Sequence, residues 1–220
     1  MELKGKKILF LGDSITEGVG ASCEEARYTC VLKKNAQLGE IINHGISGTR
    51  LARQQHPSEE TMFWDTNAFT ERYQKMEDDA DIVVVFGGTN DYGHGDAAMG
   101  CFDDRTDDTF YGALHNLYSD LIAKYPTAQL VVMTPLHRLG ENEAYNTWGL
   151  RSVGCLEDYV DIICEVAGYY GIPVLDLHRV SGLQPEVPQL KERYMPDGLH
   201  PNDAGHALIH SRLKGFLETL

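Results

Sequence analysis

The chain has 220 residues and a formal net charge of -14, because 33 acidic side chains outnumber 19 basic ones. Such a charge opposes binding to nucleic acid or to an anionic membrane surface, and no cluster of Lys and Arg offsets it. A hydrophobic content of 42% suits a folded protein. No apolar stretch reaches the roughly 18 residues that a membrane-spanning helix needs. Without an internal linker, residues 1–220 are predicted to form a single domain.

The amino terminus and the cysteines indicate a cellular location. Lysines precede the first apolar run, as in a signal peptide, but this run ends at Gly12 and lacks a small-residue cleavage site. The five cysteines are an odd number with no Cys-x-x-Cys spacing, so they predict free thiols rather than disulfides or a zinc site. We therefore expect a cytoplasmic protein with no membrane insertion.

The first predicted strand covers residues 6–11, a continuous apolar run that is typical of a strand buried on both faces of a parallel sheet. Gly12 permits a tight turn at its carboxyl end, and the hydroxyl of Ser14 follows there. Open α/β sheets bind ligands at this edge. Ser and Asp beside Gly also suit an ordinary turn or helix N-cap, so the serine alone does not predict a nucleophile.

Strands and helices then alternate along the chain. The other strands are predicted at residues 40–43, 82–86, 129–134 and 172–176. Helices are predicted at residues 27–38, 67–79, 109–124, 150–170 and 202–220. Capping oxygens at residues 107–109 favour a helix start there, and Asn202 is the expected cap of the last helix. This alternation predicts an α/β fold, a parallel sheet covered by helices on both faces.

Three long loops at strand ends, residues 50–66, 92–108 and 135–149, are candidates for shaping a substrate pocket. The first carries Phe63 and Trp64, and the third carries Tyr145 and Trp148. Such aromatics either face a substrate or anchor the loop. For the third loop we favour the pocket. The second loop is rich in Asp, but it lacks the alternating ligands of a calcium loop.

Three further polar stretches, residues 43–48, 87–91 and 197–202, also lie at strand ends or helix starts. Together with the first turn they resemble the four sequence blocks of the SGNH or GDSL-type esterases and acylhydrolases, in that family's order. The blocks fall on Gly12-Asp13-Ser14, Gly48, Asn90 and Asp197 with His200. The resemblance spans nearly the whole chain. Four ordered motifs at matching structural positions rarely arise by chance, so the family is predicted.

This resemblance implies a three-layer α/β/α sandwich with the flavodoxin-like strand order 2-1-3-4-5. It implies Ser14 as nucleophile, His200 as base and Asp197 as the acid that orients the base. The implied oxyanion hole consists of the backbone N–H groups of Ser14 and Gly48 and the side-chain amide of Asn90. Asp13 is expected to brace the turn. No cofactor and no metal are implied.

The residue types agree with that chemistry. Serine is a weak nucleophile at neutral pH and needs a base within hydrogen-bond reach, which in turn needs an orienting acid. Asp197 precedes His200 by three residues on a short Gly-containing turn, so one loop can carry both. Glycine allows close backbone approach to an oxyanion, and asparagine donates without adding charge. Ser47 is a competing hydroxyl for which no separate acid and base are indicated.

The remaining histidines show no paired metal-ligand spacing. The nearest approach is His206 with His210, four residues apart on the last predicted helix. No Glu follows the first of them, as a zinc hydrolase would need, so a solvated helix face is the preferred interpretation. The sequence therefore predicts no metal site.

The predicted function is that of a serine esterase acting on a short-chain, above all acetyl, ester of a small polar molecule such as a carbohydrate. A lysophospholipase, thioesterase or acyltransferase of the same family is the nearest alternative. A flavodoxin-like nucleotide- or flavin-binding module is the alternative from another class. For that alternative, residues 93–98 fit G-x-G-x-x-A on paper, but they lead into an acidic loop. An α/β-hydrolase elbow, G-x-S-x-G, is absent.

Overall fold

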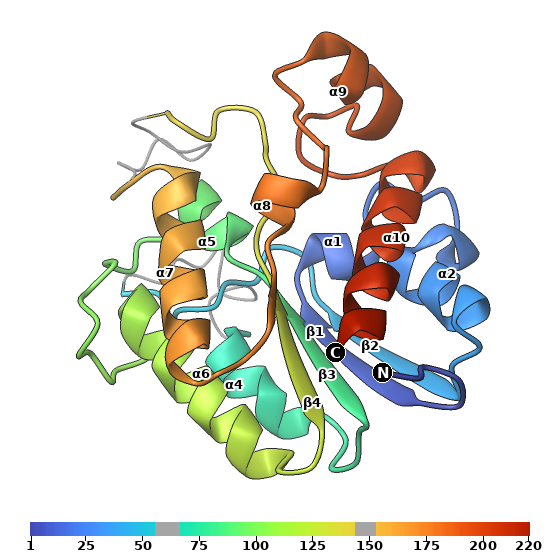
Figure 1. The fold of residues 1–220 in the computed structure, drawn as a ribbon. Coiled ribbons are helices and arrows are strands. Elements are labelled where there is room, and N and C mark those ends of the chain that lie inside the picture. The colour runs from blue at the N-terminus through green and yellow to red at the C-terminus, as the bar shows by residue number, and fades with distance from the viewer. Residues whose placement is uncertain (56–66, 144–152) are drawn as a thin grey trace.

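A computed structural model describes residues 1–55, 67–143 and 153–220 (Figure 1). Five parallel strands form one sheet in the order β2-β1-β3-β4-β5, which confirms the predicted order. The strands are β1 (Lys7–Gly12), β2 (Glu40–Gly45), β3 (Ile82–Phe86), β4 (Gln129–Met133) and β5 (Val174–Leu175). The order reverses direction beside β1, and the carboxyl ends of β1 and β3 at this switch point border the crevice where such sheets bind ligands.

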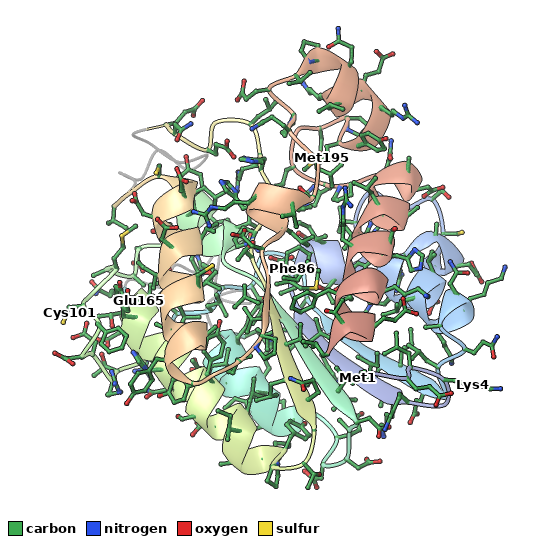
Figure 2. All side chains as sticks on the ribbon, viewed as in Figure 1. Met1, Lys4, Phe86, Cys101, Glu165 and Met195 are labelled. Atoms are coloured by element: carbon green, nitrogen blue, oxygen red, sulfur yellow. The ribbon has the colours of Figure 1, made fainter. Side chains whose placement is uncertain are left out.

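Alternate residues of each strand enter two separate apolar cores. On one face Phe10 of β1 and Val84 of β3 pack with side chains of α2 (Tyr28–Asn35) and α10 (Asp203–Thr219). On the other face Leu9 and Val83 pack with α6 (Phe110–Lys124) and α7 (Leu156–Tyr169). Figure 1 shows the resulting three layers, and Figure 2 shows Phe86 in the interior between the sheet and α10. The predicted α/β/α sandwich is confirmed.

Two predicted helices differ from the observed ones. Residues 67–79 were expected as one helix, but they form the short helices α4 (Phe69–Arg72) and η2 (Tyr73–Lys75), which end where Met76 adopts an extended conformation and enters the core. The helix expected at residues 150–170 begins only at Leu156. There, the carboxylate of Asp158 accepts the backbone N–H of Cys155, which caps the first turn.

In residues 1–55, 67–143 and 153–220, sequence periodicity missed five helical segments. They are α1 (Ser14–Glu17), η1 (Glu24–Ala26), α5 (Thr89–His94), α8 (Leu177–Val180) and α9 (Pro188–Tyr194). None of them exceeds seven residues, so an apolar repeat of 3.6 cannot establish itself. Three of them, α1, α5 and α8, follow β1, β3 and β5 within three residues and therefore lie along the carboxyl edge of the sheet.

The predicted caps of the longer helices are confirmed. The hydroxyl of Thr109 accepts the N–H of Gly112 at the start of α6, and the side chain of Asn202 accepts the N–H of Gly205 at the start of α10. Among the helices in the described ranges, none combines the length and apolar character needed to cross a bilayer.

Candidate active site

Ser14 lies at the sheet edge as the first residue of α1. Asp13 is the N-cap of this short helix, and its carboxylate accepts the backbone N–H of Ile15 at 3.0 Å. Strand β1 therefore ends in a turn that fixes the backbone on both sides of the serine. Ser14 is 5% exposed, so its hydroxyl lies in a largely desolvated position.

The turn between α9 and α10 brings His200 and Asp197 to this serine. The Nε2 atom of His200 lies 3.0 Å from Oγ of Ser14, and its Nδ1 atom lies 2.7 Å from a carboxylate oxygen of Asp197. The other oxygen of Asp197 accepts the backbone N–H groups of Leu199 and His200. The structure thus joins the first and last loops of the fold in one chain of hydrogen bonds.

The ionisation state of Asp197 decides which ring nitrogen of His200 carries a proton. Partial burial by itself raises the pKa of this carboxyl, but hydrogen bonds from the His200 and Leu199 backbone and from the His200 ring outweigh it, so the pKa lies below its ordinary value. The carboxylate is therefore ionised at neutral pH. It accepts a hydrogen bond from the N–H at Nδ1 of His200, which leaves Nε2 without a proton and able to accept the hydroxyl proton of Ser14.

The predicted donors Gly48 and Asn90 come from the loop after β2 and from helix α5, which contact each other. Gly48 has a φ of +76°, which favours glycine, in the loop after β2. Asn90 lies in α5, where its Nδ2 donates to the carbonyl of Thr49 at 3.0 Å and its Oδ1 lies 3.2 Å from Nε2 of His94. Both ends of the Asn90 amide are therefore held, and the amide is tied to the residue next to Gly48.

The loop that carries Gly48 is also attached to the helix that carries Ser14. A Cβ atom on Gly45, the last residue of β2, would overlap the backbone nitrogen of Glu17 in α1, so the two backbones are in direct contact. The carboxylate of Glu17 accepts both the backbone N–H and the hydroxyl of Ser47. This contact occupies the competing hydroxyl of Ser47 with an acid of α1.

Arg72 lies beneath the site and was not found from the sequence. Its guanidinium donates to the carbonyls of Gly12 and His44 at 2.6 Å each and to the hydroxyl of Thr49 at 2.9 Å. The residue is 5% exposed, and burial lowers its pKa to about 10, although the nearby charge of Asp13 opposes that shift. It connects the ends of β1 and β2 with the loop after β2. A single Arg in an expected helix gives no sequence signal for this role.

Two buried carboxyls, Asp13 and Asp91, flank the donors. Desolvation raises the pKa of each to about 6, although hydrogen bonds to their ionised forms oppose the shift. Asp91 accepts the backbone N–H groups of Leu51 and Ala52 at 3.0 and 2.9 Å. It therefore orders the start of the loop that follows Gly48. The sequence offered one signal for this role of Asp91, its position directly after the predicted donor Asn90.

The other residues considered from the sequence lie elsewhere. The expectation of a solvated face at His206 is wrong: the residue is 0% exposed because α10 packs on α2, and its Nδ1 accepts the backbone N–H of Tyr28. His210 contacts the amide of Asn35. The four loop aromatics, Phe63, Trp64, Tyr145 and Trp148, lie outside the described residues.

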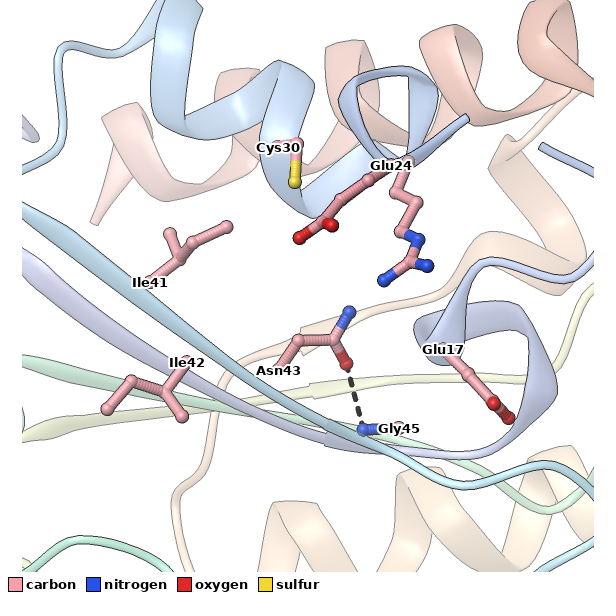
Figure 3. Close-up of a pocket in the computed structure, with 8 residues that line it drawn as sticks. Glu17, Glu24, Cys30, Ile41, Ile42, Asn43 and Gly45 are labelled. Atoms are coloured by element: carbon pink, nitrogen blue, oxygen red, sulfur yellow. Dashed lines mark hydrogen bonds between the residues drawn. The ribbon is translucent and has the colours of Figure 1, made fainter. Parts of the chain in front are cut away.

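A pocket of about 320 Å³ opens between α2 and the edge strand β2 (Figure 3). Its lining mixes two acids and one base with apolar side chains, and the amide of Asn43 accepts the N–H of Gly45 at its floor. Glu17 is the only residue of α1 that lines it, and Ser14 and His200 do not. We therefore do not assign this pocket to the serine.

Comparison with known proteins identifies the family. A model of the GDSL-like lipase/acylhydrolase family matches residues 10–208. No curated protein matches the chain. A Lactobacillus plantarum protein of known structure is 32% identical, over 98% of this chain and 98% of its own, with a TM-score of 0.82.

Two less similar structures share the fold. A possible lipase from Chitinophaga pinensis is 22% identical over 97% of this chain and 98% of its own, with a TM-score of 0.69. An acetyl xylan esterase is 23% identical over 95% of this chain and 98% of its own, with a TM-score of 0.62. The family predicted from the four motifs is confirmed. The chain belongs to the GDSL-like lipase/acylhydrolase family and is a carboxylic ester hydrolase.

Proposed function

We propose that the chain is a serine esterase that hydrolyses short-chain esters, acetyl esters above all, of a small polar molecule such as a carbohydrate. The observation that carries this proposal is the continuous hydrogen-bonded chain from Ser14 through His200 to an ionised Asp197. A serine aligned with a base, and a base aligned with an acid, is the arrangement that activates a hydroxyl for acyl transfer.

In this mechanism Nε2 of His200 takes the proton of Ser14 as Oγ attacks the ester carbonyl carbon. The N–H groups of Ser14 and Gly48 and the amide of Asn90 stabilise the oxyanion that forms on the carbonyl oxygen. Losing one such donor typically costs about 10²- to 10³-fold in rate. The tetrahedral intermediate collapses and expels the alcohol, which takes the proton from His200.

Water then completes the cycle. His200 removes a proton from a water molecule, the hydroxide oxygen attacks the acyl carbon, and the bond to Oγ of Ser14 breaks. The serine regains its proton from His200, and the carboxylic acid leaves. Asp197 stays ionised throughout and stabilises the imidazolium in each half of the cycle.

Two observations support a short acyl group on a neutral polar molecule. One protein of the same fold is an acetyl xylan esterase, which supports an acetylated carbohydrate as the substrate class. The net charge of -14 disfavours substrates with anionic headgroups or an anionic lipid surface. A lysophospholipase, thioesterase or acyltransferase of the same family remains the alternative.

The test compares two serine variants. Ser14→Ala should lower kcat/KM for p-nitrophenyl acetate by about 10⁴-fold or more, because the group that forms the acyl intermediate is gone. Ser47→Ala is the matched control: it also removes a hydroxyl near the same edge, and it should retain activity within a few-fold. Circular dichroism would check that both variants fold. Full activity of Ser14→Ala would refute the assignment.

The substrate class requires a second comparison on the wild-type protein. Activity should fall as the acyl chain of p-nitrophenyl esters lengthens from acetyl to dodecanoyl, and acetylated xylo-oligosaccharides should release acetate. A preference for long chains would favour the lysophospholipase alternative. Tight binding of a flavin or nucleotide would favour the binding module. Against that module, Gly93 lies within α5, where a Cβ would overlap the guanidinium of Arg138, so close packing explains this glycine.

A further inference from the structure

Three side chains with metal-binding atoms meet at the carboxyl ends of β4 and β5. His137 and Glu141 belong to the segment after β4, and His178 lies in α8. One ligand atom from each lies within 4.8 Å of the others. Nδ1 of His137 is 2.9 and 3.0 Å from the two carboxylate oxygens of Glu141, and the rings of His137 and His178 have centroids 3.8 Å apart. None of the three takes part in the proposed esterase mechanism.

The environment of His178 indicates that a ligand is missing from its contacts. The residue is 6% exposed, and its buried Nδ1 has no hydrogen-bond partner among the described residues. An unpaired buried nitrogen costs free energy that a metal bond would recover. An imidazole nitrogen with no hydrogen-bond partner is a group that a metal ion can bind.

The carboxylate of Glu141 is already oriented toward the two rings. One of its oxygens accepts the backbone N–H of Arg138 at 3.1 Å, and the other accepts the amide of Gln184 at 3.4 Å. Hydrogen bonds of this kind fix ligand carboxylates in metal sites.

The surrounding charge favours a cation. The three residues line a pocket of about 290 Å³ together with Asn142, Glu157 and Arg179. The guanidinium of Arg179 forms ion pairs with Asp176 and Asp161 at 2.7 Å each and with Glu157 at 3.4 Å. Three carboxylates therefore surround the one positive charge that lines the pocket. The pocket also has room for a water molecule at an open coordination position.

We propose that His137, Glu141 and His178 form a binding site for a transition-metal ion, with Zn²⁺ as the best fit, that fastens the segment after β4 to α8. Two imidazoles and one carboxylate with a fourth position for water are a donor set that Zn²⁺ accepts, whereas Ca²⁺ and Mg²⁺ prefer oxygen ligands alone. Tetrahedral zinc needs ligand atoms about 3.4 Å apart, which small side-chain rotations provide from the present separations.

This site would act on the turn that carries Asp197 and His200. Between His137 and Glu141 lies Leu139, whose backbone N–H donates to the carbonyl of Gly198 at 2.8 Å. A metal ion bound by His137 and Glu141, which flank Leu139 in the sequence, would hold the segment that contacts this turn. The ion therefore has a positioning role. Its binding stabilises the folded protein by an amount that grows with the logarithm of the free metal concentration once that concentration exceeds Kd.

The test measures metal binding directly on protein stripped with a chelator. Co²⁺ is the probe, because tetrahedral Co²⁺ absorbs in the visible region, and Zn²⁺ should displace it. We expect one equivalent bound by the wild type, and Glu141→Gln should weaken binding by at least about tenfold. Glu77→Gln is the matched control, since Glu77 pairs with His44 at 2.8 Å but no second histidine joins them in the described part of the chain. That control should bind Co²⁺ like the wild type.

A second readout separates a metal site from a simple His–Glu ion pair. Addition of Zn²⁺ should raise the Tm of the wild type and of Glu77→Gln by several degrees, and it should leave the Tm of Glu141→Gln nearly unchanged. His137→Gln serves as a further ligand variant that spares the buried His178. Absence of stoichiometric Co²⁺ binding, or equal affinity in the wild type and Glu141→Gln, would overturn the proposal. Neither measurement depends on esterase activity.

Discussion

Asp13 shows how one buried carboxyl makes stability depend on pH. Its side chain is 2% exposed and accepts the N–H of Ile15, so it caps the helix that presents Ser14. Desolvation raises its pKa from 3.8 to about 6. The folded protein therefore keeps this proton over a pH range in which the unfolded chain has lost it, and stability falls as pH rises through that range.

We expect Asp13→Asn to reduce this pH dependence. The amide oxygen of Asn can still accept the Ile15 N–H, but Asn cannot ionise, so the loss of unfolding free energy between pH ~4 and pH ~6 should become smaller than in the wild type. Urea denaturation at several pH values would measure it for both proteins. The pKa of Asp91 is also raised to about 6, but Asp91 is present in both proteins and therefore contributes equally to their two curves of unfolding free energy against pH. Parallel curves would contradict the assignment of the proton to Asp13.

At the scale of elements, the contact between β2 and α1 positions the proposed nucleophile. Gly45 ends β2, and its backbone lies against Glu17 and Thr16 of α1 with no room for a side chain. The loop with Gly48 leaves β2 at this point, so the same contact sets the distance between a proposed oxyanion donor and Ser14. Backbone atoms on both sides cannot move aside as a flexible side chain would.

Gly45→Ala should therefore lower the free energy of unfolding by about 1–3 kcal/mol and reduce esterase activity as well. The matched control is Gly215→Ala in α10, where a Cβ meets nothing within 4 Å and the position is exposed. Removing a glycine from a helix interior should stabilise by about 0.5–1 kcal/mol and leave activity unchanged. Chemical denaturation and p-nitrophenyl acetate hydrolysis measure both effects. Equal stability of the two variants would show that the contact adjusts freely.

For the whole molecule, the net charge of -14 should select among substrates. A negative protein repels an anionic ester before contact, and salt screens that repulsion because the Debye length falls from about 30 Å at 0.01 M to about 10 Å at 0.1 M. We expect kcat/KM for a p-nitrophenyl ester with a free carboxylate to rise by up to roughly tenfold over this range. Neutral p-nitrophenyl acetate should change little. The same salt response for both esters would contradict a long-range effect of charge.

The sequence by itself determined the fold class and, through the family resemblance, predicted the strand order and the proposed catalytic residues and oxyanion donors. Strands such as residues 82–86 are apolar throughout because both faces of a parallel sheet are buried, and this pattern is visible without coordinates. The motifs around Ser14, Asn90 and His200 are short and local, so they can be recognised in one dimension.

Only the tertiary structure decided which distant groups meet. Arg72 binds carbonyls of two strands, and His137 and Glu141 approach His178, which lies 37 positions after Glu141 along the chain. No periodicity or local motif encodes such contacts, since they depend on how the loops leave the sheet edge. The burial of His206 has the same origin, because this residue of α10 is covered only when α10 packs on α2, where its ring lies against Tyr28. Local patterns specify elements, and the free energy of packing them together specifies the contacts between loops.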